Sequence, residues 1–210
     1  MRGGRDLNSK TSLLNNHTKP QRKKSINNKV HIDDPLAISN LNQIIRSKIK
    51  NNKPLIDEII ILCIGTDRST GDALGPLIGS KLQNFNLNDR IKVYGTLENP
   101  IHATNLEQKI TQIEQQFDNP LIIAIDAGLG KSNSVGNINV NNGPLQPGSG
   151  VNKKLPTVGD FHITGLVNVG GYMEYFVLQS TRLSIVIKMS KIITYALVNC
   201  FKRLKNDKRL

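Results

Sequence analysis

Asp72, Asp126 and His162 combine residue types that can do hydrolytic chemistry with positions that suit a shared site. Asp126 directly follows the apolar run 121–125, and Asp72 lies in the glycine-rich loop that follows the apolar run 59–64. His162 stands where a long stretch rich in glycine, asparagine and proline gives way to a helical pattern. Two carboxylates and one imidazole can ligate a divalent metal ion with open coordination positions. They can equally act as general acid and general base on a scissile amide.

Each of these residues also has a structural explanation that the sequence leaves open. Asp72 can cap the helix that follows it, Asp126 can close its strand as an Asx-turn, and His162 can be a structural histidine. His102 is a weaker candidate for the same edge of the sheet, because it follows the short strand expected at 91–94 without a spacing argument. The two carboxylates can share one site only if their strands are neighbours in the sheet.

The loop after the first apolar run does not fit the common phosphate-binding motifs. It reads GTDRSTGDALG from residue 65, so Gly71 is followed by Asp72 where a P-loop needs lysine and then serine or threonine. The dinucleotide fingerprint G-x-G-x-x-G is also missing, and we expect no nucleotide cofactor. Asp67 and Ser69 in this loop are interpreted as turn-forming residues.

The sequence does not support a nucleophilic triad. It has no G-x-S-x-G elbow, and Ser69 and Ser132 lie in loops without that framing. Cys63 lies in the first apolar run and Cys200 in a late helical pattern, so we expect both to be buried, reduced thiols. Two such cysteines fit neither a disulfide framework nor a zinc ribbon.

Apolar runs of strand length alternate with helical patterns along the chain. We expect helices at 35–50, 76–85, 106–117, 163–178 and 189–204, strands at 59–64, 91–94, 121–125 and 183–187, and a β-ribbon at 136–140. Strands separated by helices indicate right-handed crossovers and a mainly parallel sheet with helices on both faces. The predicted fold class is therefore α/β, with three layers in the order α/β/α. Function in such sheets gathers at the carboxyl ends of the strands.

The net charge of +12 comes almost entirely from the two ends of the 210-residue chain. Residues 1–30 carry eight basic side chains against one acidic, and residues 201–210 carry five against one. We expect a disordered basic tail at 1–32, one domain at 33–205 and a basic end at 206–210. No aromatic residues are interleaved for base stacking, so nucleic-acid binding is expected only through these tails, if at all. His17 and His31 lie in or beside the first tail and are not site candidates.

Composition indicates an ordinary globular chain, with 38% apolar and 21% charged residues. No apolar run reaches the roughly 18 residues that a membrane-spanning helix needs. The first thirty residues lack the apolar stretch of a secretory signal. We therefore predict a cytoplasmic protein without a membrane span.

Several long motifs resemble the YyaC family of sporulation proteins from endospore-forming bacteria. They are CIGTDRSTGDALGP at 63–76, YGTL at 94–97, HATNL at 102–106, GPL at 143–145 with Gly148, VGDFHITG at 158–165 and VGGYME at 169–174. The resemblance covers about residues 33–200. It implies a place in the superfamily of hydrogenase-maturation peptidases (HybD-like) and germination proteases, whose domains are α/β/α sandwiches. A forespore or spore location would follow from this family.

In the maturation peptidases a Glu, an Asp and a His contact a metal ion, and the resemblance carries those positions to Asp72, Asp126 and His162. The H-x-x-G-L context of their histidine is reproduced at 162–166. Two features depart from that pattern. The first carboxylate is Asp72, one methylene shorter than glutamate, and the G-x-G-N glycine pair is reduced to Gly65-Thr66. The resemblance thus implies a divalent metal of unspecified identity and a protein or peptide substrate.

Two functions follow from these observations. The first is a sporulation-associated endopeptidase-like hydrolase, in which Asp72 and Asp126 activate water or hold a metal and His162 is a ligand or proton-transfer partner. The alternative is a non-catalytic sporulation protein that keeps the peptidase fold as a protein-binding module, with segment 128–159 as its partner surface. Action on nucleic acid through the tails is a third, weaker hypothesis.

Overall fold

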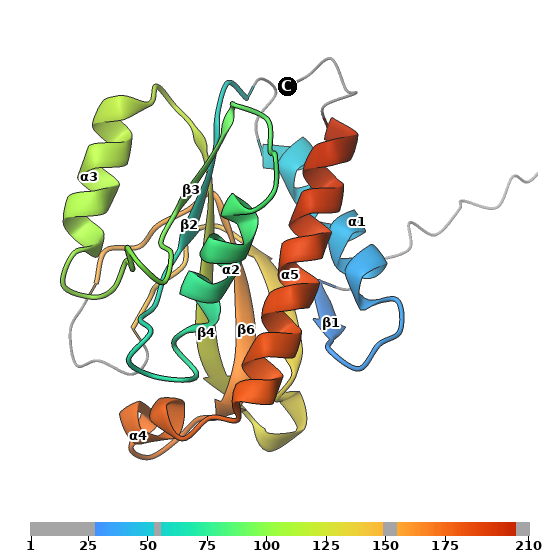
Figure 1. Cartoon of the computed structure of the whole chain (residues 1–210), viewed down its shortest axis with the longest axis vertical. Helices are drawn as coiled ribbons and strands as arrows, with labels where there is room; N and C mark the ends of the chain where they lie inside the picture. Colours follow the sequence, from blue (N-terminus) through green and yellow to red (C-terminus); the bar gives the residue numbers. More distant parts are fainter. Residues whose placement is uncertain (1–27, 53–55, 149–154, 205–210) are drawn as a thin grey trace, which may run out of the picture.

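The computed structural model describes residues 28–52, 56–148 and 155–204, and its centre is a six-stranded sheet (Figure 1). The strand order is β1-β5-β6-β4-β2-β3. The strands are β1 (Lys29–His31), β2 (Ile59–Cys63), β3 (Ile91–Tyr94), β4 (Leu121–Gly130), β5 (Asn137–Asn142) and β6 (Phe161–Val169). β6, β4, β2 and β3 are parallel to one another. At one edge β5 pairs antiparallel with β6, and β1 pairs antiparallel with β5.

Helices cover both faces of this sheet. They are α1 (Ala37–Asn52), α2 (Leu74–Gln83), α3 (Leu106–Gln116), α4 (Glu174–Gln179) and α5 (Leu183–Leu204), with a short 3-10 turn at Ser132–Ser134. α1, α2 and α5 pack against one face and α3 against the other, while α4 lies beyond the end of β6 (Figure 1). The expected three-layer α/β/α architecture with a mainly parallel sheet is thus confirmed.

β2 shows why continuous apolar runs form the centre of the sheet. All five of its residues are buried, because alternate side chains enter opposite layers. Ile59, Ile61 and Cys63 belong to the core beneath α1, α2 and α5, and Ile60 and Leu62 to the core beneath α3. Cys63 and Cys200 are both buried free thiols, as expected.

Two predicted elements in the second half of the chain are wrong. The expected helix at 163–178 is instead strand β6 followed by the short α4. Alternate residues of β6 are buried and half-buried, which is the period of a strand covered by α5 on one side. The expected strand at 183–187 is the first turn and a half of α5. β4 also continues to Gly130, beyond the expected end at residue 125.

α5 is long and apolar enough to cross a membrane by length and composition alone. In the structure it is the central helix of its layer, since residues such as Val186, Ile193 and Leu197 are fully buried in the core. Its apolar character is explained by this packing between α1, α2 and the sheet.

Strand β1 lies inside the segment that the sequence assigns to a disordered tail, so the predicted boundary at residue 32 is wrong for residues 29–32. β1 pairs antiparallel with β5, and the side chains of Val30 and Ile32 are buried. An edge strand of three residues is too short to show a recognisable alternation in the sequence. Residues 1–27 and 205–210, which include most of both predicted tails, lie outside the described residues.

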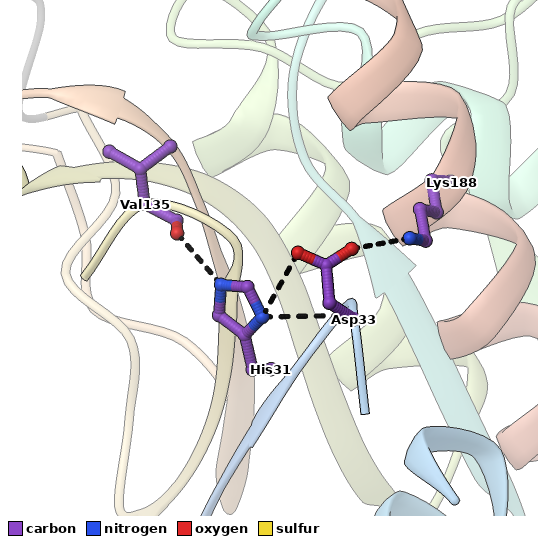
Figure 2. Close-up of polar contacts among 4 residues, drawn as sticks. All are labelled: His31, Asp33, Val135 and Lys188. Atoms are coloured by element: carbon purple, nitrogen blue, oxygen red, sulfur yellow. Dashed lines mark hydrogen bonds and ion pairs between the residues drawn. The ribbon is translucent and has the colours of Figure 1, made fainter. Parts of the chain in front are cut away.

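Polar contacts fix the chain just after β1 (Figure 2). The Nε2 atom of His31 lies 3.2 Å from the carbonyl oxygen of Val135, and its Nδ1 atom accepts from the N–H of Asp33 at 3.2 Å. The ammonium group of Lys188 on α5 donates to the Asp33 carboxylate. These contacts connect the end of β1 to the segment that precedes β5 and to α5, so His31 has a structural role.

Two truncations test this boundary. Removing residues 1–27 is expected to leave the melting temperature within about 2 °C, whereas removing residues 1–32 is expected to lower it by several degrees. The longer deletion removes Val30 and Ile32 from the core, and burial of such a side chain contributes about 1.5–3 kcal/mol. Thermal denaturation followed by circular dichroism is the measurement. Equal melting temperatures for both truncations would show that β1 contributes nothing to stability.

Candidate active site

The site begins at Ile64, where the chain leaves β2 between two parallel segments. The N–H of Ile64 donates to the carbonyl of Ile125 in β4 at 2.7 Å. On its other side Ile64 forms a parallel bridge with Ile101. The carbonyl of Ile101 accepts from the N–H of Gly65 at 2.8 Å. Asp126 and His102 each come one residue after these partners. The pairing therefore brings both side chains to the edge where β2 ends.

Asp72 reaches the same edge through a tight return of the loop that precedes α2. The N–H of Thr66 donates to the carbonyl oxygen of Asp72 at 3.2 Å. Gly65 has a φ of +138°, and a Cβ atom on it would lie 2.0 Å from that same oxygen. Only glycine permits both the backbone angle and the close approach. Gly65 thus lets the chain fold back and place Asp72 beside Asp126.

A pocket of about 300 Å³ opens between these segments. The carboxyl, imidazole and guanidinium groups in its lining belong to Asp72, Asp126, His102 and Arg68. Most of the remaining wall is apolar or small, and comprises Ile64, Gly65, Thr66, Ser69, Ala103, Thr104, Ala127, Pro147, Gly148, Leu155, Tyr175 and Leu178. Because the wall is largely apolar, water screens the charged groups in the pocket poorly.

The two carboxylates form an electrostatically coupled pair. Asp126 is 8% exposed, and its Oδ1 atom accepts one hydrogen bond from the N–H of Ala127 at 2.8 Å. Burial and the nearby charge of Asp72 raise the pKa of Asp126 well above its usual value. Burial also raises the pKa of Asp72, an effect that the positive charge of His102 partly offsets. A pair of this kind favours one ionised and one protonated carboxyl group.

His102 is held in place by the start of α3. The backbone N–H of His102 donates to Oδ1 of Asn105 at 2.8 Å, and the side-chain amide of Asn105 donates to the carbonyl of Pro100 at 3.0 Å. Its Nδ1 atom lies 2.9 Å from the hydroxyl of Thr104, whose N–H also donates to it at 3.4 Å. A proton on Nε2 is present both in the charged ring and in the neutral ring whose Nδ1 accepts.

The structure places His162 away from this pocket. It is the second residue of β6, opposite Ala124, whereas Asp126 is opposite Thr164 two residues further along. Both ring nitrogens have partners: Nδ1 donates to the carbonyl of Gly143 at 3.0 Å, and Nε2 lies 3.5 Å from the Asn141 amide. The expectation that His162 begins a helix near the carboxyl edge is therefore wrong, because the residue belongs to the early part of a strand.

The implied metal set of two aspartates and His162 does not fit this geometry. Within the described ranges no three or more His, Cys, Asp or Glu side chains form a group that could hold a metal ion. The two carboxylates alone do suit a hard cation, since Mg²⁺ is commonly held by one or two carboxylates and several waters. Burial raises the pKa of both groups, and the charge of His102 offsets this only in part and only for Asp72, so a bound cation would stabilise the ionised pair.

α4 contributes Tyr175 and Leu178 to the wall of the pocket. The N–H of Gly71 donates to the carbonyl of Leu178 at 2.9 Å, and a Cβ atom on Gly71 would lie 2.9 Å from the Leu178 side chain. This contact joins the loop that carries Asp72 to the helix that carries Tyr175. Sequence reasoning missed Tyr175 and assigned Ser69 to a turn, although both line the pocket. The sequence signal for these two residues was their position, since Ser69 lies in the motif at 63–76 and Tyr175 directly follows the motif at 169–174.

Comparisons with known proteins agree with this domain. A family model described as "Protein of unknown function (DUF1256)" matches residues 29–196. The uncharacterized protein YyaC of Bacillus subtilis (strain 168) is 49% identical over 166 residues, which cover 78% of each chain.

Two solved structures are similar at low sequence identity. The [NiFe] hydrogenase maturation protease HycI from Thermococcus kodakarensis KOD1 is 13% identical, with a TM-score of 0.48 over 76% of this chain and 99% of that one. The hydrogenase maturating endopeptidase HybD from E. coli is 15% identical, with a TM-score of 0.41 over 68% of this chain and 93% of that one.

Asp126→Asn tests whether the buried carboxylate opposes folding. Because the pKa of Asp126 is raised in the folded state, the stability that its protonated form contributes is fully present below the unfolded-state pKa, near 4. That contribution is lost as the pH rises through the folded-state pKa. Asparagine does not ionise and can still accept from the N–H of Ala127. We expect the variant to match the parent near pH 4 and to exceed it by about 1–3 kcal/mol in free energy of unfolding at pH 8.

Asp67→Asn is the matched control, because Asp67 is exposed in the same loop and does not line the pocket. Its unfolding free energy should follow that of the parent at every pH. Urea denaturation between pH 4 and pH 8 measures both variants. An Asp126→Asn variant that is less stable throughout would show that the carboxylate has a structural role.

Proposed function

The chain belongs to the family described as "Protein of unknown function (DUF1256)", and on that premise we propose that it is an endopeptidase-like hydrolase. Asp72 and Asp126 activate a water molecule against a peptide bond. The observation that carries the proposal is the coupling of two buried carboxylates, both with raised pKa values, in one pocket at the carboxyl edge of the sheet. Carboxyl pairs of this kind can divide general-base and general-acid roles between their members.

The environments of the two carboxyl groups suggest which takes each role. Asp126 is the more deeply buried and has the more strongly raised pKa, so it holds the shared proton and acts as general acid. Asp72 lies beside His102, whose charge favours the ionised form, so it acts as general base. The pair titrates as a unit, and its apparent pKa values belong to both groups.

The reaction then balances without a covalent enzyme intermediate. Asp72 accepts a proton from water as the water oxygen bonds to the scissile carbonyl carbon. The C–N bond breaks as Asp126 donates its proton to the departing amine. The proton held by Asp72 then passes back to Asp126 and restores the starting state. The N–H on Nε2 of His102 is available to hold the substrate carbonyl or the water.

A polypeptide is the substrate class that the pocket favours. Its volume, about 300 Å³, is at the lower limit for small-molecule sites and suits one or two amino-acid side chains. The carboxylates repel phosphate groups, which agrees with the expectation of no nucleotide cofactor. The resemblance to the YyaC family of sporulation proteins motivates placing this hydrolysis in the cytoplasm of sporulating cells, including the forespore.

Purified protein incubated with a proteome-derived peptide mixture tests the proposal, with new termini identified by mass spectrometry. We expect cleavage by the parent and at least a hundredfold loss in both Asp72→Asn and Asp126→Asn, because each removes a proton-transfer group. Asp67→Asn is the control and should retain activity. If neither parent nor control cleaves any peptide, the hydrolase proposal is wrong.

Two histidine variants separate the roles of His102 and His162 in the same assay. His102→Gln should lower kcat because its ring lines the pocket. His162→Gln should leave kcat per folded molecule nearly unchanged, since both nitrogens of that ring are engaged by Gly143 and Asn141. A selective loss in His162→Gln would restore the role that the sequence assigned to His162.

A divalent cation held by the ionised carboxylates of Asp72 and Asp126 is the alternative to the shared proton in this proposal, because a carboxylate that ligates a metal does not keep its proton. When bound it would supply positive charge that polarises the scissile carbonyl. We expect saturating Mg²⁺ or Mn²⁺ to raise the melting temperature of the parent at pH 8 by several degrees, since a ligand at 100 times its Kd adds about 2.7 kcal/mol. The Asp72→Asn variant should lose that rise. An equal rise in both proteins would place the cation elsewhere.

A non-catalytic binding module is the second candidate function, and the exposed apolar residues of α4 favour it. Tyr175 and Phe176 are both more than half exposed beside the pocket. The segment 128–159, which the sequence proposes as the partner surface, contributes the end of β4 and the whole of β5 to the sheet, and its residues 149–154 lie outside the described residues. Peptide binding without cleavage in the assay above would favour this candidate.

A further inference from the structure

The largest exposed apolar side chains gather between the end of β6 and the start of α5. Five of the eight exposed large hydrophobic residues of the described chain lie within eight positions: Val169, Tyr172, Met173, Tyr175 and Phe176. Tyr172 is 88% exposed and Tyr175 is 54% exposed, and the rings of Tyr175 and Phe176 meet edge to face at 5.6 Å. Exposed apolar side chains gathered in this way mark an interaction site more often than single exposed residues do.

This aromatic cluster is continuous with the pocket. Tyr175 belongs to both, since its ring is exposed on α4 and also forms part of the pocket wall. Leu178, one helical turn further on, lines the pocket and is buried. A chain that enters the pocket from the α4 side therefore passes over an aromatic surface.

Ser69 is a second, independent indication of a ligand on the same side of the pocket. It lines the pocket and is only 7% exposed, yet its hydroxyl has no hydrogen-bond partner within the described part of the chain. A buried hydroxyl without a partner is costly and needs an explanation. Ser69 lines the same pocket as Asp72 and Asp126, and the loop that carries it meets α4 through Gly71, so a ligand in the pocket is within the reach of this loop.

We propose that the site takes a polypeptide with a bulky apolar side chain next to the scissile bond, held by the Tyr175 side of α4 and by a hydrogen bond from Ser69 to the substrate main chain. This inference rests on the proposed function and names its substrate class. Peptide groups are present in every polypeptide, so Ser69 contributes affinity irrespective of sequence. The aromatic surface distinguishes apolar from charged side chains, because burial of a large apolar side chain contributes about 1.5–3 kcal/mol.

The experiment uses the cleavage sites found in the peptide mixture and one fluorogenic peptide built from the most frequent site. For the parent we expect an apolar residue to be enriched at one position beside the cleaved bond. Tyr175→Ala should lower kcat/KM for the fluorogenic peptide about tenfold and weaken that enrichment. Tyr175→Phe keeps the ring and should retain both. Circular dichroism and thermal denaturation establish that each variant is folded.

The chain offers a matched control for Tyr175. Tyr195 on α5 is similarly exposed, at 47%, and its ring also meets another ring edge to face, that of Phe85 at 6.0 Å. Tyr195 does not line the pocket. Tyr195→Ala should therefore leave kcat/KM and the cleavage preference unchanged.

Ser69→Ala removes the unpaired hydroxyl at almost constant shape. It should raise KM about fivefold, the effect of one net hydrogen bond, with kcat within twofold and no loss of stability. Thr194→Val is its control, since Thr194 is also buried with an unpartnered hydroxyl but lies on α5 outside the pocket lining. That variant should leave KM unchanged.

The outcomes separate this inference from the proposed function. Cleavage by the parent without an apolar preference, or with the same KM in Ser69→Ala and the same preference in Tyr175→Ala, would overturn the inference while the hydrolase proposal stands. Equal losses in Tyr175→Ala and Tyr195→Ala would also overturn it, because the effect would not come from the pocket. Absence of cleavage by the parent would overturn both.

Discussion

The hydrogen bonds on the two sides of Ile64 determine where the groups of the pocket lie. One joins its N–H to Ile125 in β4, and the next N–H along the chain joins Ile101. Parallel pairing fixes register, and a shift by one residue turns every side chain to the other face of the sheet. Asp126 and His102 face the pocket because each follows one of these partners. A shift in β4 would instead turn the carboxylate toward the core beneath α2 and α5.

The fold holds this arrangement against an electrostatic penalty. Two carboxyl groups share a poorly solvated pocket, and burial raises the pKa of each. One hydrogen bond from Ala127 and the charge of His102 offset only part of that penalty. The rest must be supplied by the surrounding core, in which every residue of β2 is buried. Functional sites commonly conflict with stability in this way.

The two sides of the pocket are built from parts of the chain that are about one hundred residues apart. The loop of Asp72 meets α4 through the hydrogen bond from Gly71 to Leu178, and a side chain on Gly71 would separate them. The groups proposed for chemistry and the aromatic surface proposed for recognition thus form one structural unit. Any movement of α4 would reach the loop that carries Asp72 and Ser69.

The sequence alone predicts β2, β3 and the first half of β4 but not β6, because continuous apolar runs are local patterns whereas the pairing that makes β6 a strand is not. It also predicts α1, α2 and α3, and it singles out Asp72 and Asp126, which do line one pocket although Asp126 lies inside β4 and not in a loop. Which histidine joins the two carboxylates, by contrast, depends on the tertiary structure: His102 lines the pocket and His162 does not. The sequence places His162 near the start of a helix, but its segment pairs with both β4 and β5 and is therefore a strand. His102 entered the pocket because the chain returns beside Ile64, and a contact between distant segments leaves no periodicity in either.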